Sequence, residues 1–90
     1  MEVVYKYELV VTDRQLVTMP KEAKLMSVQV QNGTPCLWAL VNPENPTEEV
    51  PILLYGTGHK IPDTENIAYI GTIQMPKYGL VLHAFLDKKL

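Results

Sequence analysis

Residues 24–41 read KLMSVQVQNGTPCLWALV, and this stretch decides the fold. Asn32-Gly33 stands at its centre and supplies the two positive φ angles that a type I′ β-turn requires. The residues on either side are rich in apolar and β-branched types, which is typical of strands. The pattern therefore predicts a β-hairpin with strands at 24–31 and 34–41.

The two faces of this hairpin differ in polarity. A two-residue loop fixes the register, so one face pairs Val30 with Pro35, Val28 with Leu37 and Met26 with Ala39. This face is wholly apolar and is predicted to face the core. The other face is mixed and carries Ser27, Gln29, Gln31 and Trp38. We interpret it as a candidate recognition surface; the alternative is that Trp38 is simply a core residue.

Short strands are predicted along the rest of the chain, because runs of Val, Ile, Tyr, Leu and Thr are bounded by Pro, Gly, Asn and Asp. No long helical stripe interrupts them. About seven strands without crossover helices indicate an all-β domain, a small antiparallel β-sandwich or barrel. The further strands are expected at 3–11, 15–19, 50–55, 67–75 and 80–86, with a polar connection at 21–23, an exposed loop at 42–49 and a turn at 76–79.

The composition is that of a single globular domain spanning residues 1–90. The chain is 47% hydrophobic and 20% charged, and no apolar run approaches the ~20 residues that span a bilayer. The first residues lack the basic and apolar regions of a signal peptide. We therefore expect a cytoplasmic protein with no membrane partner.

Charge and residue counts bear on partners and cofactors. A net charge of −2 gives no field that would attract nucleic acid, so no nucleic-acid partner is expected. A single cysteine, Cys36, and two histidines distant in sequence lead us to expect no metal and no other cofactor, with Cys36 a buried apolar residue. Because so short a chain has a modest core and free sheet edges, we expect a homo-oligomer.

A glycine-rich loop follows the predicted strand 50–55. It reads Gly56-Thr57-Gly58-His59-Lys60, and glycines allow positive φ angles that turn N–H groups toward a common point. A hydroxyl, an imidazole and an ammonium group stand within the same residues. The loop therefore has donors for a phosphate or carboxylate, and its alternative interpretation is a tight turn at the end of a strand.

Four segments of the chain, in their order and spacing, carry a resemblance: residues 27–33, 36–41, 56–59 and 69–72. They resemble an uncharacterised family of small bacteriophage proteins of about this length. The resemblance covers most of the chain, and the family has no established activity, so it implies a phage origin and the host cytoplasm. Lys60 departs from the family, in which proline is common at that position.

A phage accessory protein without catalytic motifs is expected to act by binding. We expect it to counter host antiviral defence by sequestering a nucleotide-derived immune signalling molecule. A base needs an aromatic platform, and phosphates need backbone N–H groups and a cation. The candidate ligand-binding residues are Trp38, Gln29, Gln31, Tyr55, Gly56, Thr57, Gly58, His59, Lys60 and Tyr69.

A protein inhibitor of a host defence enzyme or nuclease is the first alternative. The acidic segment with Glu44, Glu48 and Glu49 would meet a basic groove of that protein, and electrostatic complementarity would speed the encounter. A sequestering protein should bind a small molecule without a protein partner. An inhibitor should co-purify with a host protein.

A phosphodiester-cleaving enzyme is the second alternative. His59 and Asp63 would be its acid–base pair, with Lys60 nearby, since imidazole titrates near neutral pH and a carboxylate can orient it. No nucleophile motif or paired carboxylates accompany them. His83, in the last predicted strand, is interpreted as a hydrogen-bonded structural residue and is only a secondary candidate.

Overall fold

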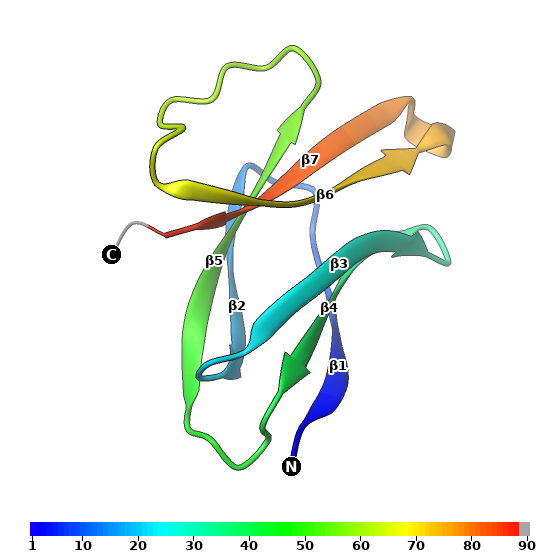
Figure 1. Ribbon diagram of the computed structural model, residues 1–90. Helices are drawn as coiled ribbons and strands as arrows, with labels where there is room; N and C mark the ends of the chain where they lie inside the picture. The colour runs from blue at the N-terminus through cyan, green and yellow to red at the C-terminus, as the bar shows by residue number, and fades with distance from the viewer. Residues whose placement is uncertain (89–90) are drawn as a thin grey trace.

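The computed structural model describes residues 1–88 as seven β-strands and one short 3₁₀ helix (Figure 1). The predicted all-β class and the number of strands are confirmed. In chain order the elements are β1 (Val3–Glu8), β2 (Arg14–Pro20), β3 (Lys24–Gln31), β4 (Thr34–Val41), β5 (Thr47–Gly56), β6 (Ile67–Met75), η1 (Pro76–Tyr78) and β7 (Leu80–Asp87).

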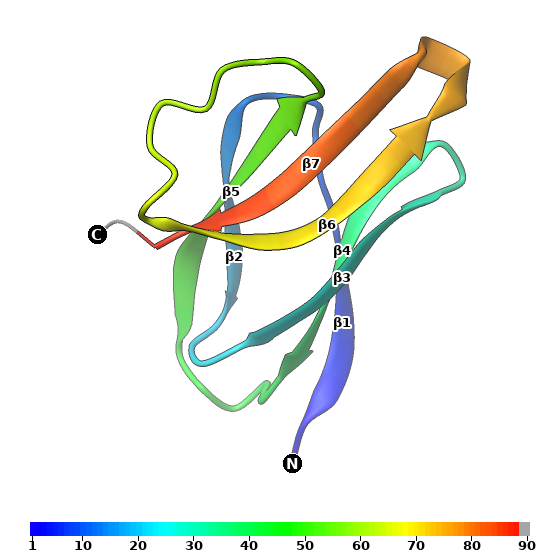
Figure 2. The same cartoon turned by 45° about the horizontal axis from the view of Figure 1, so that its top comes forward.

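The strands form two antiparallel sheets that pack as a sandwich. The three-stranded sheet has the order β1-β4-β3, and the four-stranded sheet has the order β2-β5-β7-β6. The sheets come closest where β6 lies against β3, as Figure 2 shows. Gly71 permits this approach, because a Cβ atom at its position would lie 3.0 Å from Cγ2 of Val28.

The β3–β4 hairpin has the predicted turn. Asn32 and Gly33 have φ angles of 52° and 79°, as a type I′ turn requires. The predicted register holds from Gln31↔Thr34 to Ser27↔Trp38. The apolar face of the hairpin forms part of the core, with Val28, Leu37 and Ala39 buried.

The prediction for Met26 was wrong. A β-bulge shifts the register between Leu25 and Ser27, so that Leu25 pairs with Ala39 in place of Met26. An extra residue in one strand leaves the residue itself unpaired, and Met26 is 54% exposed. Leu25 packs against the core instead.

The core lies between the two sheets and is apolar throughout. The described residues include no buried polar or charged residue. Cys36 is buried, as predicted, and its Sγ atom is 3.4 Å from the carbonyl oxygen of Thr34. The most deeply buried large side chains are Met19, Cys36, Leu37, Val41 and Ile52.

Two predicted strand boundaries, at the end of β1 and at the start of β5, differ clearly from the structure. β1 ends at Glu8, and the following residues form the connection to β2. β5 begins at Thr47, inside the predicted loop, because its first residues pair with the end of β2, where Pro20 faces Thr47. The connection 21–23 is a turn in which Glu22 has a φ angle of 67°.

Candidate functional site

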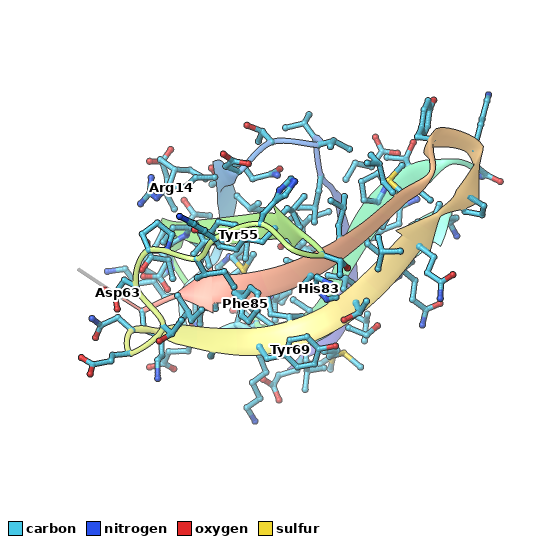
Figure 3. All side chains as sticks on the ribbon, turned by 90° about the horizontal axis from the view of Figure 1, so that it is seen from above. Arg14, Tyr55, Asp63, Tyr69, His83 and Phe85 are labelled. Carbon is cyan, nitrogen blue, oxygen red and sulfur yellow. The ribbon has the colours of Figure 1, made fainter. Side chains whose placement is uncertain are left out.

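Three aromatic side chains form a row on the outer face of the four-stranded sheet (Figure 3). Tyr55 comes from β5, Phe85 from β7 and Tyr69 from β6. The ring centroids are 6.2 Å apart for Tyr55 and Phe85, and 5.8 Å apart for Phe85 and Tyr69. Tyr69 is 62% exposed, so the end of this aromatic row presents a ring to solvent.

The registers in which β5 and β6 pair with β7 bring the three aromatic side chains together. Phe85 faces Leu53 on one side and Tyr69 on the other, while its neighbour Ala84 is buried in the core. A register shift between Tyr69 and Gly71 marks a second β-bulge. The bulge places both Tyr69 and Thr72 on the outer face although they are three residues apart.

A chain of hydrogen bonds continues from the aromatic row along the same face. The hydroxyl oxygens of Tyr69 and Thr72 are 2.6 Å apart. Thr72 Oγ1 is 3.0 Å from Nδ1 of His83, and Thr57 Oγ1 is 2.7 Å from its Nε2. Both ring nitrogens of His83 are thus engaged, which fixes the ring and gives the face a polar edge.

A small pocket opens beside Tyr55, with a volume of about 180 Å³. Arg14 projects from the start of β2, and its Nε atom is 3.7 Å from Oδ2 of Asp87. The guanidinium group has five donors and its side chain is 54% exposed, so donors remain beyond the contact with Asp87. The pocket is lined by Arg14, Leu53, Tyr55, Pro62, Asp63, Ile67 and Asp87.

The glycine-rich loop is a turn that follows β5, and its backbone N–H groups take part in local hydrogen bonds. The N–H of Thr57 donates to the carbonyl of Val81 (3.3 Å), and the N–H of His59 donates to that of Gly56 (3.1 Å). A Cβ atom on Gly56 would lie 3.0 Å from Cε1 of His59, so the imidazole folds over Gly56. Gly58 has a φ angle of 88°. Two of the N–H groups expected to bind an anion therefore already have acceptors.

His59 lies apart from the aromatic row. It lines a cavity of about 150 Å³ together with the core residues Leu54 and Leu82. Asp63 lines the pocket beside Tyr55, and its carboxylate accepts hydrogen bonds from the N–H of Glu65 and the amide of Asn66, both at 3.0 Å. The two residues of the hypothetical acid–base pair thus line different cavities.

Trp38 lies on the outer face of the other sheet. It is half-buried between Lys6 of β1 and Ser27 of β3. Gln29 and Gln31 are exposed on the same face, and Gln31 accepts a hydrogen bond of 2.7 Å from Lys6 Nζ. The predicted mixed face exists, but within one chain it points away from Tyr55 and Tyr69.

Comparison with known proteins places the chain in a family. A family model described as "Domain of unknown function (DUF7352)" matches residues 1–90. The chain belongs to this family. No curated protein and no solved structure matches it.

Two further findings concern the described part of the chain. No helix within residues 1–88 has the length and apolar character needed to cross a membrane. In the same residues, no three His, Cys, Asp or Glu side chains gather as a metal site would require.

Sequence reasoning named Tyr55, Thr57 and Tyr69, which the structure brings to one face of this family member. It missed Phe85, Thr72 and Arg14. Alternation within the strand 80–86 places Phe85 on the same side as His83, so this part of the row was readable from the sequence. The bulge in β6 and the approach of β2 to β5 depend on tertiary pairing, so Thr72 and Arg14 had no local signal.

Proposed function

We propose that this protein binds a nucleotide-derived signalling molecule and performs no catalysis. The observation that carries the proposal is the aromatic row on the outer face of the four-stranded sheet. Nucleobases stack on exposed aromatic rings, and each stacked base contributes about 1–3 kcal/mol by alanine substitution. The 62% exposure of Tyr69 leaves its ring available for such a contact.

The groups around the row supply the remaining contacts of a nucleotide. The hydroxyls of Thr57 and Thr72, which His83 holds in place, offer polar contacts for the edge of a base. Arg14 provides a cation beside Tyr55, and Lys60 is exposed in the following loop. Guanidinium and ammonium groups are the common protein partners of phosphate.

The biological setting follows from the resemblance to phage proteins. In this proposal the chain is a phage accessory protein in the host cytoplasm, where it sequesters an immune signal and blunts antiviral defence. Sequestration needs tight binding without turnover, and the aromatic row supplies stacking contacts for such binding. The separation of His59 from Asp63 supports binding over phosphodiester cleavage.

The test uses protein expressed in infected, defence-competent bacteria. Small molecules released by heat are identified by mass spectrometry, and affinities are measured by calorimetry with a cyclic dinucleotide and with ADP-ribose as probes. Tyr69→Ala should lower the affinity about 10-fold or more, as expected for the loss of one stacked base.

Tyr78→Ala is the matched control, because Tyr78 is 61% exposed but lies in η1 at the end of the β6–β7 hairpin. Trp38→Ala tests the opposite face. Both variants should bind as the wild type does. Failure of the protein to retain or bind any of these molecules contradicts the proposal, and loss of binding in Trp38→Ala alone moves the site to the other sheet.

Inhibition of a host protein is the second candidate, and a groove at the start of β5 favours it. The groove has a volume of about 230 Å³, with an apolar floor that includes Met19, Leu25 and Val50. Its lining also carries four acidic residues and one cation, namely Glu22, Glu48, Glu49, Asp87 and Lys88, so it is acidic in balance. Such a groove fits a basic and apolar segment of a protein.

The inhibitor candidate has a separate test. Affinity purification from the same infected cells should yield a stoichiometric host protein. The double substitution Glu48→Gln and Glu49→Gln should lower its recovery, while Tyr69→Ala should leave it unchanged. Unchanged recovery with the double substitution, together with lowered recovery with Tyr69→Ala, would show that the groove is not the surface that binds the host protein.

A further inference from the structure

β1 forms an open edge of the three-stranded sheet. Within residues 1–88, the only strand that pairs with β1 is β4, so its other edge is free; Figure 1 shows it at the rim of this sheet. All residues of β1 except Tyr7 are exposed, including Val3 (38%), Val4 (50%) and Tyr5 (42%). An edge strand with unpaired N–H and C=O groups is a template for another strand.

We propose that β1 pairs in antiparallel fashion with β1 of a second copy of this chain, about a two-fold axis at Val4. The two three-stranded sheets would then form one continuous sheet across the dimer. A two-fold axis uses the same edge of both chains, so the assembly closes as a dimer. This surface is independent of the aromatic row.

The pairing of β1 with β4 determines which residues of β1 can bond to a new strand. Leu9 N–H donates to the carbonyl of Pro35 at 2.8 Å, and the register continues from Tyr7↔Leu37. In an antiparallel ladder, residues two apart direct their N–H and C=O groups to the same side. The odd-numbered residues therefore bond to β4, and Val4 and Lys6 direct their groups outward.

This alternation limits the possible registers to those in which even-numbered residues face each other. Opposite charges directly across two strands are favourable, and like charges are unfavourable. With Val4 facing Val4 of the partner subunit, Glu2 faces the partner's Lys6, and the same pair occurs twice by symmetry. A shift in one direction sets Glu2 against the partner's Glu8, and a further shift sets Lys6 against the partner's Lys6.

The apolar side chains support the same register. Val3 and Tyr5 lie on the core side of the sheet, opposite Val41 and Ala39 of β4. Both are exposed in the single chain because the sandwich is open beyond β1. In the proposed dimer, Val3 faces the partner's Tyr5 in both copies, which would cover this apolar surface.

The experiment is sedimentation velocity over a concentration series, with far-UV circular dichroism as a check on folding. The wild type should show a concentration-dependent dimer. Val4→Pro should abolish it, because proline removes an outward N–H group and leaves the bonds to β4 intact. A monomeric wild type, or a dimer unchanged by Val4→Pro, overturns the proposal.

Charge reversal tests the register. Glu2→Lys and Lys6→Glu should each raise the dimer dissociation constant about 10-fold, because each sets two pairs of like charges opposite one another. The double variant should restore the wild-type value. If the double variant does not recover the wild-type dissociation constant, this register is overturned. Lys6→Glu also removes the hydrogen bond from Lys6 to Gln31, whereas Glu2→Lys leaves that bond in place and so tests the charge pair by itself.

Discussion

Two groups of aromatic side chains have similar ring geometry and opposite positions relative to the core. Tyr5 and Tyr7 of β1 lie on the core side of the three-stranded sheet, with ring centroids 6.4 Å apart and an interplanar angle of 69°. Phe85 and Tyr69 lie on the outer face of the other sheet, at 5.8 Å and 62°. Ring geometry alone therefore does not distinguish a structural pair from a surface that can bind.

The surroundings of the rings make the distinction. Tyr7 packs against the core, and burial raises the pKa of its phenol, with a further rise from the neighbouring Tyr5. Tyr69 instead turns its hydroxyl to Thr72 and exposes its ring. Tyr7 is thus held against the core, whereas Tyr69 offers an exposed ring.

The largest effect expected from this difference is on stability. Tyr7→Ala should lower the free energy of unfolding by about 3 kcal/mol, because it removes a large side chain packed against the core. Tyr69→Ala should lower it by about 1 kcal/mol or less, since most of that ring is already in water. Urea denaturation followed by Trp38 fluorescence measures both, and equal losses would contradict the distinction.

Phe85 connects the two tyrosines of the aromatic row, so its removal tests the row as a unit. Phe85→Ala should cost about 2 kcal/mol of unfolding free energy, from lost burial and two lost ring contacts. Phe85→Leu keeps much of the apolar volume and should cost about half as much. A negligible cost for Phe85→Leu would mean that the ring contacts contribute nothing.

The hydrogen bonds beside the row should have a smaller effect. Thr72→Val keeps the shape of the side chain and removes the hydroxyl between Tyr69 and His83, at a cost of about 1 kcal/mol. Thr18→Val is the control, because Thr18 is an exposed residue in the middle of β2. The ¹⁵N chemical shifts of the His83 ring should change in the first variant only, and unchanged shifts would show that the contact is absent in solution.

Much of the fold could be predicted because its signals are local. Asn32-Gly33 requires positive φ angles, and the alternation around it identified the core face of the hairpin. The prediction failed at Met26, where a bulge moves Leu25 into the core position. Leu25 and Met26 are both apolar, so either could occupy the core position, and the apolar alternation alone does not reveal the bulge.

The candidate site was less predictable because it combines residues from separate strands. Tyr55 and Tyr69 were named as aromatic candidates, but the sequence could not show that Phe85 lies between them. Trp38 is equally aromatic and lies on the opposite side of the sandwich. The order β2-β5-β7-β6 decides this, and strand order is set by packing between distant segments.

The smallest expected effect is a pH dependence that arises from Tyr7. Its pKa is raised in the folded chain, so the folded state holds the phenol proton to higher pH than the unfolded state does. The contribution to stability is complete below the unfolded pKa, near 10, and is lost as the pH rises through the folded pKa. The unfolding free energy of the wild type should therefore fall across this alkaline range relative to that of Tyr7→Phe. A wild-type slope in Tyr7→Phe would show that the phenol is equally accessible in both states.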